Sequence, residues 1–527
     1  MRPIILTILD GWGIGEPEQT NPIYRAKISN LKKIEQLYPF CSLQASGGAI
    51  GLPWKEAGNS EVGHLTIGSG RTIYQYLPRI SMDIENETFF TNPAFLKTID
   101  HVKKYNSTLH LIGLISSGNV HSYLEHVYAL LELARRNNID NLRLHLFTDG
   151  KDAPLKEGIK IISILEQKLK NPNWKIASIV GRNYAMDRNH NWDRTETAYN
   201  LIVNGAGEKT FNPLERIREY YDQDITDTYI KPIVIIDDNQ NPIGIVKNND
   251  AIISWDFRED SARQLTEAFV KKDFNKFERK LIENLFFCTM TEYEKDLPIA
   301  IAYPPMKIIN HLTEILNQYN KKILKVAETE KYAHVTYFFN GNQENLFPNE
   351  TRKLIASNIV THYDETPEMQ SEKITETIIE GLKENYDLIV ANYSNADMIG
   401  HTGNLKAGIK AVEAIDKALK PLIKLAEKGE CVLIITADHG NIEQMVNLHT
   451  GEPKTEHTLN PVPFYLVGKE FKKVQAPRPT SQDEVVAGGG WGMPQGMLSD
   501  IAPTILELMQ IPQPSEMTGK SLLSVLK

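Results

Sequence analysis

The alternation of short apolar runs with helical patterns is the feature that most constrains how this chain can fold. Runs rich in β-branched residues predict strands at residues 3–9, 109–115, 142–148, 175–180, 251–257, 386–393, 431–436 and 462–467. Helical patterns separate many of them, at residues 122–136, 156–170, 259–271, 307–318, 371–384 and 405–428. This alternation is typical of βαβ units, in which helices cover a mostly parallel sheet. The sequence therefore predicts an α/β fold.

Two interruptions of this alternation suggest that one domain is inserted into another. Residues 76–92 break the rhythm of strands and helices, and two prolines break it again at residues 302–306. We therefore expect residues 76–306 to form an inserted α/β domain, while residues 1–75 and 307–527 share one sheet. Residues 475–496 are rich in Pro and Gly and lack periodicity, so we expect a surface loop there.

The composition is that of an ordinary globular protein and disfavours several classes. With 58 Lys and Arg against 67 Asp and Glu, the net charge of −9 argues against a general nucleic-acid binder. No apolar run approaches the length of a membrane helix, and the N-terminus lacks the features of a signal peptide. Cys41, Cys288 and Cys431 lie far apart, which excludes a CxxC motif and fits a reducing compartment. We expect a cytoplasmic protein that binds neither nucleic acid nor membrane.

Polar residues follow several predicted strands, at the sheet edge where open α/β sheets bind ligands. These residues are Asp10, Asp149, Asp152, Arg182, Arg258, Asp397 and Asp438. Any one of the aspartates could simply cap a helix or close a turn. Because several of these strand ends are followed by Gly, His or Arg, the set as a whole favours a ligand site.

A second pattern combines carboxylates with imidazoles at spacings suited to metal binding. The candidates are Asp10, Asp397, His401, Asp438, His439 and His457. A lone histidine is more often a hydrogen-bonded structural residue, but three carboxylates and three imidazoles could bind two divalent ions. The mixture of oxygen and nitrogen donors favours Mn²⁺ or Zn²⁺ over Mg²⁺ or Ca²⁺.

The motif GNSEVGH at residues 58–64 contains a candidate nucleophile, Ser60. Its small residues allow the backbone to approach an ion or phosphate closely. Ser60 could begin a helix whose N–H groups face an anion, or it could simply be the N-cap of that helix. A serine hydroxyl becomes a good nucleophile only when a base or a metal lowers its pKa.

Cationic side chains near predicted strand ends suggest an anionic ligand. They are His121, Arg182, Arg188, Arg258, Arg263 and Lys331. Solvated surface charge is the alternative for any single arginine, but Arg258 directly follows an apolar strand. Arginine can bind phosphate or carboxylate through two parallel hydrogen bonds. The chain contains neither a GxGxxG turn after a strand nor a GxxxxGK[ST] loop, which disfavours dinucleotide and P-loop nucleotide sites.

Taken together, these motifs occur in the order found in one known family. They are LDGWG (9–13), GNSEVGH (58–64), VHS (120–122), GRNYAMDR (181–188), AETEKYAHVT (327–336), GHTG (400–403), TADHGN (436–441), HTLNPVPF (457–464), SDIAPTILELM (499–509) and MTGKSLL (517–523). The chain resembles the cofactor-independent (2,3-bisphosphoglycerate-independent) phosphoglycerate mutases of the alkaline phosphatase superfamily. The resemblance covers essentially the whole chain.

The resemblance implies an alkaline-phosphatase-like metal-binding domain, interrupted by a substrate-binding domain. It implies two divalent ions, typically Mn²⁺, and no bisphosphoglycerate. Asp397, His401 and His457 would bind one ion, and Asp10, Ser60, Asp438 and His439 the other. Ser60 would be phosphorylated transiently, and Asp152 would transfer a proton. The substrate would contact His121, Lys151, Asp152, Arg182, Arg188, Arg258 and Lys331. The implied reaction interconverts 3-phosphoglycerate and 2-phosphoglycerate in a monomeric enzyme.

Departures from the family pattern concern substrate binding and leave two alternatives open. Lys151 and Ser261 replace arginines of the family, and Ser117 replaces an acidic residue. Lysine keeps the charge but loses the planar fork of arginine, whereas serine loses the charge. One alternative is a metal-dependent phosphomonoester hydrolase, or a mutase for another small phosphate ester. The other is a non-catalytic relative, which the intact Ser60 and metal candidates disfavour.

Overall fold

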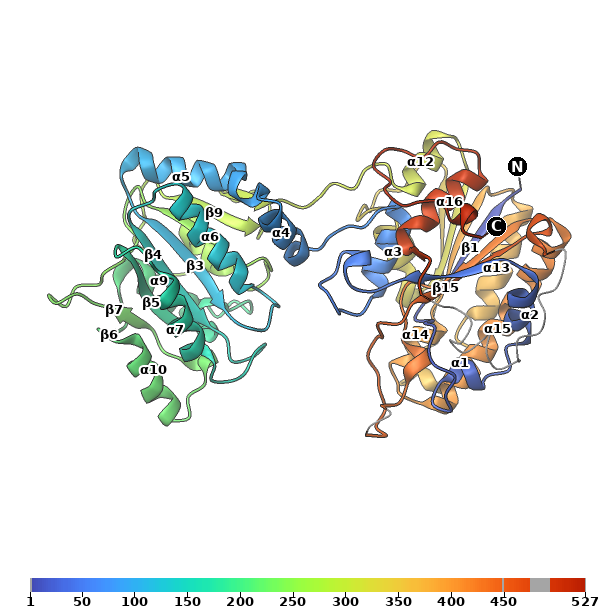
Figure 1. Ribbon diagram of the computed structural model, residues 1–527, viewed down its shortest axis with the longest axis horizontal. Helices are drawn as coiled ribbons and strands as arrows, with labels where there is room; N and C mark the ends of the chain where they lie inside the picture. The colour runs from blue at the N-terminus through green and yellow to red at the C-terminus, as the bar shows by residue number, and fades with distance from the viewer. Residues whose placement is uncertain (1, 448–449, 474–492, 527) are drawn as a thin grey trace. The chain divides into compact units, whose positions relative to one another are not determined.

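The computed structural model describes residues 2–447, 450–473 and 493–526. The chain divides into two compact units: Met1–Gln75 together with Lys307–Lys527, which we call unit 1, and Tyr76–Met306, which we call unit 2 (Figure 1). Most of the loop predicted at residues 475–496 lies outside the described residues. Its last residue, Gly496, begins a short strand that pairs with residues 43–44, so the loop ends earlier than predicted.

Unit 1 contains a mostly parallel sheet in the order β12-β11-β13-β1-β14-β15-β2-β16. Its strands are β1 (Ile4–Leu9), β2 (Phe40–Gln44), β11 (Ile323–Glu328), β12 (Glu350–Ile355), β13 (Leu388–Tyr393), β14 (Val432–Thr436), β15 (Val462–Val467) and β16 (Gly496–Met497). β1 pairs in parallel with β13 and β14, and all of its residues are buried because it lies between them. β15 pairs antiparallel with β14 and β2.

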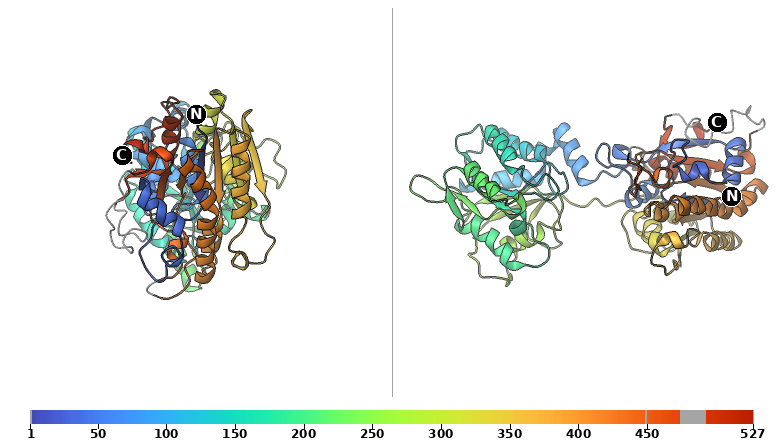
Figure 2. Two further views of the ribbon diagram at one scale, coloured as in Figure 1. Left: turned by 90° about the vertical axis from the view of Figure 1, so that its right-hand side faces the viewer. Right: turned by 90° about the horizontal axis from the view of Figure 1, so that it is seen from below.

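Two groups of helices cover this sheet (Figures 1 and 2). The helices of unit 1 are α1 (Pro22–Arg25), α2 (Ser29–Leu37), α3 (Ser60–Ser69), α12 (Leu312–Gln318), α13 (Ser371–Lys383), α14 (Asn395–Gly400), α15 (Leu405–Lys428) and α16 (Ile501–Leu508). α1, α2 and α13 pack against α15, whereas α12 and α16 pack against α3. The side chain of Asn404 caps the start of α15, and Gly429 in the left-handed conformation follows its last residue. Asparagine at the N-cap and glycine after the last turn are common at helix ends.

Unit 2 contains a second, mostly parallel sheet in the order β10-β9-β8-β3-β4-β5-β7-β6. Its strands are β3 (Leu109–Ile115), β4 (Leu142–Thr148), β5 (Trp174–Gly181), β6 (Glu208–Thr210), β7 (Ile233–Ile235), β8 (Ala251–Ser254), β9 (Phe286–Thr291) and β10 (Ala300–Tyr303). Its helices are α4 (Tyr76–Glu85), α5 (Pro93–Tyr105), α6 (Leu124–Arg136), α7 (Gly158–Lys168), α8 (Arg182–Ala185), α9 (Trp192–Asn204), α10 (Pro213–Asp222) and α11 (Arg263–Val270).

The sheet of unit 2 separates two apolar cores. One core contains side chains of α5, α6, α7 and α10, such as Phe95 and Ile162. The other contains side chains of α8, α9 and α11, such as Tyr199 and Phe269. Burial on both faces explains why the strands are almost continuously apolar in sequence.

The α/β fold predicted from the sequence is confirmed, but several elements differ from expectation. The segment that breaks the predicted rhythm contains α4, whose Pro78 lies in the first turn, where proline is tolerated. α12 begins at Leu312 instead of residue 307, because Asn310 adopts a positive φ of 55° and its N–H bonds to Glu314. The antiparallel strands β2 and β7 were not expected, since β2 is partly polar and β7 is short.

The three cysteines are free and buried, and burial raises the pKa of each thiol to about 12. They are therefore poor nucleophiles. None of the helices in the described part of the chain is both long and apolar enough to cross a membrane.

Candidate active site

Ser60 lies at the start of α3 with its hydroxyl group among charged side chains of unit 1. Its Oγ is 2.9 Å from Asp10 Oδ1, 3.0 Å from His439 Nε2 and 2.6 Å from Lys331 Nζ. The N-cap of α3 is Asn59, whose side chain accepts a hydrogen bond from the Val62 N–H. The capping interpretation of Ser60 is therefore wrong, and its hydroxyl is available for chemistry.

Three carboxylates meet at one edge of the sheet of unit 1. Asp10 follows β1, Asp397 lies in α14 just after β13, and Asp438 follows β14. These strands are neighbours in the order β13-β1-β14, so their carboxyl ends bring the side chains together. Asp10 and Asp397 are buried, which by itself raises the pKa of a carboxyl group. The ammonium group of Lys331 has the opposite effect and holds the pKa of both well below the usual range.

Three histidines direct their Nε2 atoms into this cluster. The Nδ1 atoms of His401 and His457 lie 2.7 Å from the carbonyl oxygens of Thr455 and Gly58. Because a carbonyl oxygen only accepts hydrogen bonds, the Nδ1 of each ring is the donor, and Nε2 faces the cluster. The two Nε2 atoms are 3.1 Å apart, and each is 3.2 Å from Asp397 Oδ1. His439 likewise directs its Nδ1 to the Gly440 carbonyl at 3.3 Å and its Nε2 to Ser60.

This arrangement fits two divalent cations. The ligand atoms of Asp397, His401 and His457 lie within 4.8 Å of one another, and so do those of Asp10, Asp397 and His439. Divalent cations bound between these atoms would balance the charge of the carboxylates that gather there. A third group of this kind joins Asp10 and Asp438 to His64, which the sequence analysis did not assign.

The structure gives His64 the role of orienting its neighbours through hydrogen bonds. Its Nδ1 is 2.8 Å from the Ser60 carbonyl and 3.1 Å from Asp438 Oδ2, while its Nε2 is 3.0 Å from Asn392 Nδ2. Both ring nitrogens therefore have partners already. Asn392, which also donates to Asp10 Oδ2 at 2.7 Å, is a second residue that sequence reasoning missed. A polar residue within the apolar strand β13 was the available signal.

Lys331 lies in this cluster of unit 1, whereas the arginines with which the sequence analysis grouped it belong to unit 2. Its Nζ is 2.7 Å from Asp10 Oδ1 and 2.6 Å from Asp397 Oδ2. Burial alone would lower the pKa of Lys331, but the surrounding carboxylates raise it above the ordinary value, so the side chain is a cation. It contributes one positive charge to a site dominated by carboxylates.

The other predicted substrate residues line a cavity of about 650 Å³ in unit 2. They are His121, Lys151, Asp152, Arg182, Arg188 and Arg258, together with Ser261. Arg182 Nη1 is 2.5 Å from both Asp149 Oδ1 and Asp152 Oδ2, and its Nη2 is 3.1 Å from His121 Nε2. Burial and the charge of Arg182 lower the pKa of His121 to about 4, so its imidazole is neutral at neutral pH.

Sequence reasoning missed one residue that lines this cavity and another that contacts two of its arginines. Asp260 is 2.6 Å from Arg188 Nη1 and 3.3 Å from Arg258 Nε, so one carboxylate orients two arginines. Burial alone would raise its pKa, but the two arginines lower it. Arg194 lines the cavity. Arg263, by contrast, donates to the Tyr293 carbonyl at 2.9 Å.

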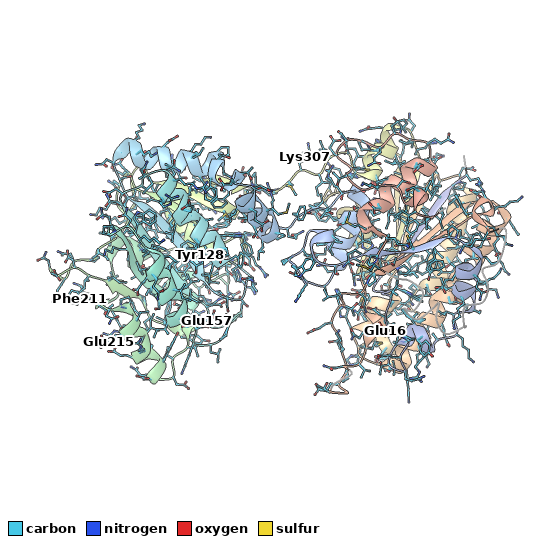
Figure 3. The ribbon with its side chains drawn as sticks, in the orientation of Figure 1. Glu16, Tyr128, Glu157, Phe211, Glu215 and Lys307 are labelled. Carbon is cyan, nitrogen blue, oxygen red and sulfur yellow. The ribbon has the colours of Figure 1, made fainter. Side chains whose placement is uncertain are left out.

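The acidic residue that the family pattern leads one to expect at Ser117 has a counterpart in space. Glu157, just before α7 (Figure 3), accepts hydrogen bonds from the N–H of Ser117 at 2.9 Å and from its hydroxyl at 2.8 Å. A carboxylate is therefore present beside this loop, although it comes from another segment.

Comparisons with known proteins give this geometry a family. The family model "BPG-independent PGAM N-terminus" matches residues 80–295, and "Type I phosphodiesterase / nucleotide pyrophosphatase" matches residues 273–455. The 2,3-bisphosphoglycerate-independent phosphoglycerate mutase 1 of Methanosarcina acetivorans is 45% identical over 526 residues, which cover 99% of this chain and 98% of the relative. The chain belongs to the family of 2,3-bisphosphoglycerate-independent phosphoglycerate mutases.

Further members of this mutase family agree over the same length. The mutase of Clostridium perfringens is 44% identical over 99% of both chains. A crystal structure of Leishmania mexicana phosphoglycerate mutase at low cobalt concentration covers 98% of this chain and 97% of its own, with 32% identity and a TM-score of 0.57. The resemblance inferred from the motifs is confirmed.

Proposed function

We propose that the protein interconverts 3-phosphoglycerate and 2-phosphoglycerate through a phosphoserine at Ser60, without bisphosphoglycerate. The observation that carries this proposal is the Ser60 hydroxyl at the start of α3, in contact with Asp10, His439 and Lys331. Family membership supports the same reaction, because the curated relatives are named for it. Cytoplasmic location and a monomeric state remain predictions from the sequence.

In the proposed first half-reaction, Ser60 Oγ attacks the phosphorus of the substrate. The Ser60 hydroxyl group gives up its proton as a bond forms between Oγ and phosphorus, the bond from phosphorus to the glycerate oxygen breaks, and that oxygen takes up a proton. Lys331 stabilises the negative charge that the Ser60 oxygen and the phosphoryl oxygens carry, because its ammonium group is 2.6 Å from Oγ. The N–H groups of the first turn of α3 offer further hydrogen bonds to the anion.

The residues at this site would hold two divalent cations, for which we propose Mn²⁺. One would be bound by Asp397, His401 and His457, and the other by Asp10, Ser60, Asp438 and His439. Such ions lower the pKa of a bound hydroxyl group and neutralise phosphoryl charge.

In the proposed second half-reaction, glycerate remains bound, and its other hydroxyl group loses its proton and attacks the phosphorus of phospho-Ser60. A bond forms between that oxygen and phosphorus, the bond from phosphorus to Ser60 Oγ breaks, and Oγ takes up a proton. The cavity of unit 2 suits this task because Arg188, Arg258 and Lys151 line it and can bind carboxylate and phosphate groups. We assign proton transfer between the glycerate hydroxyl groups to Asp152, whose carboxylate is 2.5 Å from Arg182 Nη1. The retained alcohol reacts efficiently because its effective concentration is high.

A hydrolase for a small phosphate ester is the second candidate, and Ser261 is the observation that favours it. Ser261 lines the cavity of unit 2 at a position where the family pattern has a charged arginine. A hydrolase would share the phosphoserine step, but water would attack phospho-Ser60 in place of glycerate.

A product assay distinguishes the two candidates. The full-length protein is incubated with 3-phosphoglycerate and Mn²⁺ but no bisphosphoglycerate, and both 2-phosphoglycerate and free phosphate are quantified. We expect 2-phosphoglycerate as the main product and complete loss of turnover after chelation, with recovery when Mn²⁺ is added back. Free phosphate as the main product would favour the hydrolase. Full turnover by metal-depleted protein would contradict the proposed role of the ions.

A further inference from the structure

Glu443 is a buried carboxylate near the candidate active site to which the proposed chemistry gives no role. It lies in a short 3₁₀ helix, Ile442–Gln444, directly after the TADHGN motif, and it is 3% exposed. Its Oε2 accepts hydrogen bonds from the backbone N–H groups of Gly13 at 3.0 Å and Asn441 at 2.9 Å. Its Oε1 accepts from Asn460 Nδ2 at 3.0 Å and from the Thr458 hydroxyl group. Four donors thus converge on one charge.

These donors come from the three loops that carry most of the candidate metal ligands. Gly13 is three residues after Asp10, and Asn441 is two residues after His439. Thr458 directly follows His457. Backbone hydrogen bonds tie the same loops to each other, from Ile442 N–H to the Gly11 carbonyl and from Thr458 N–H to the Gly440 carbonyl. The carboxylate of Glu443 is therefore the common partner of loops that come from distant parts of the sequence.

The glycines of these loops allow the carboxylate to lie directly against the backbone. A Cβ atom at Gly13 would collide with the carboxylate of Glu443, one at Gly440 would lie 2.5 Å from Oε1, and one at Gly15 would lie 2.8 Å from Cγ. Side-chain Cβ atoms essentially never approach a neighbour this closely. The loops thus leave space for the Glu443 side chain on three sides.

Asn441 extends this connection to the fourth ligand segment. Its backbone N–H donates to Glu443 Oε2, while its side-chain Nδ2 donates to Asp397 Oδ1 at 3.0 Å. Asp397 is the residue shared by two of the candidate cation sites. A single residue therefore separates Glu443 from the carboxylate at the centre of the site.

We propose that Glu443 is a positioning residue that sets the spacing of Asp10, His439 and His457, and thereby the affinity of the site for divalent cations. This inference rests on the proposed function. The charge of the carboxylate matters because its hydrogen bonds are charge-assisted and hold three loops in one geometry. Residues that orient metal ligands in this way typically change metal affinity or activity by about tenfold to hundredfold when they are replaced.

The test measures Mn²⁺ binding by the full-length protein, with Glu443→Gln as the main variant. Gln has the same size, but its amide group offers donors where four donors already converge. We expect Mn²⁺ affinity to fall by about tenfold to hundredfold, as measured by the electron paramagnetic resonance signal of free Mn²⁺. We also expect kcat at limiting Mn²⁺ to fall while KM for 3-phosphoglycerate changes little.

Asp416→Asn is the matched control. Asp416 is also a buried carboxylate with several donors, since it accepts from the N–H groups of Asn30 and Leu31 and from the Asn30 side chain. It joins α15 to the start of α2 and contacts no candidate ligand. We expect this variant to lower the melting temperature without changing Mn²⁺ affinity, which is the result of a merely structural role.

A second variant, Gly13→Ala, covers the case in which Glu443→Gln does not fold. It keeps the charge of Glu443 but forces the carboxylate away from the loop of Asp10, so it should also weaken Mn²⁺ binding. Unchanged Mn²⁺ affinity in a folded Glu443→Gln or Gly13→Ala protein would overturn the inference. Failure of the wild-type protein to bind Mn²⁺ would instead overturn the proposed function, so the two failures are distinguishable.

Discussion

The polar sites of the two units differ in burial and in the sign of their charge. In unit 1, Asp10, Asp397 and Asp438 are buried around one cation, Lys331. In unit 2, cationic side chains dominate the cavity, and they are far more open to solvent: the side chains of Arg188 and Arg258 are 50% and 48% exposed. Both sites nevertheless lie beyond the carboxyl ends of parallel strands.

This difference indicates that unit 1 is suited to phosphoryl transfer and unit 2 to binding the anionic substrate. Charges buried away from water interact strongly, so the carboxylates of unit 1 can hold divalent cations, and such cations can stabilise a reacting phosphoryl group. Charges at a solvent-exposed cavity are screened, so the arginines of unit 2 can bind an anionic ligand and release it again. We therefore expect substitutions at Ser60 and its partners in unit 1 to abolish turnover, and substitutions of the arginines in unit 2 to weaken substrate binding.

The largest effect should come from Ser60→Ala. The change removes the proposed nucleophile, so kcat should fall by at least about a thousandfold. Because Asn59 caps α3, stability should change by less than about 1 kcal/mol. Binding of 2-phosphoglycerate, measured by calorimetry, should stay within a few-fold of the wild type, since unit 2 keeps its arginines.

Ser69→Ala is the control for this variant, because Ser69 is a buried serine at the other end of α3 that donates to the Arg71 carbonyl at 3.0 Å. It should retain activity. An active Ser60→Ala protein would refute the assignment of the nucleophile. It would also contradict the expectation that unit 1 performs the phosphoryl transfer while unit 2 binds the substrate.

The next effect should come from Arg258→Ala in unit 2. Removing one charge-assisted contact to the substrate costs on the order of 1.5–3 kcal/mol, so kcat/KM should fall by about tenfold to hundredfold, mainly through KM. Steady-state kinetics check this. Arg216→Ala is the control, since Arg216 pairs with Glu219 on the surface of α10. A normal KM in Arg258→Ala would mean that the anion is bound elsewhere.

A smaller effect concerns the stability of unit 2 in acid. His145 Nε2 is 2.9 Å from His110 Nδ1, and His145 Nδ1 is 2.7 Å from Ser178 Oγ. Burial, with the neighbouring His110, lowers the pKa of His145 well below its ordinary value, so the folded protein keeps it neutral. The unfolded chain binds a proton there below about pH 6.5. Above that pH, neither state binds the proton and stability is unaffected. As the pH falls below it, the unfolded chain alone gains the proton, so the folded protein loses stability.

Between about pH 7.5 and about pH 5.5, the free energy of unfolding should fall by about 1.4 kcal/mol for each such histidine. Hydrogen exchange in β3 and β4 measures this loss of stability. In His145→Gln the loss should be smaller by about 1.4 kcal/mol. An identical pH dependence in the wild type and His145→Gln would contradict the prediction.

Much of the fold could be predicted because buried strands are recognisable in the sequence as apolar runs. Some strands that were not predicted carry polar residues, such as β12, which lies at the edge of its sheet and reads ETRKLI. Others, such as β7 (IVI), are short. Helix starts were less predictable because their caps can be distant in sequence. The start of α7, for example, is capped by Asp227, which accepts from the N–H groups of Glu157 and Gly158.

The candidate site could be predicted where a residue's position after a strand determines its location. That rule indicated Asp10, Asp397 and Asp438, which come together in unit 1. It could not assign Lys331, whose partners Asp10 and Asp397 lie far away in the sequence, or Asp260, one of whose two arginine partners lies 72 residues away. The sequence grouped Lys331 with the other cationic side chains, and only the fold shows that its nearest partners are the carboxylates of Asp10 and Asp397.

The smallest effect should come from Lys151→Arg. Lys151 is exposed and lines the cavity of unit 2, so a longer, planar guanidinium group has room to contact the substrate. Arginine keeps the charge and adds a second parallel hydrogen bond, and we expect KM to stay the same or to fall by less than about threefold. Lys151→Met, which keeps the length but removes the charge, should instead raise KM by several-fold. A severe loss of kcat/KM in Lys151→Arg would show that this part of unit 2 is as tightly packed as the site of unit 1. That result would contradict the view that the cavity of unit 2 is the more open of the two sites.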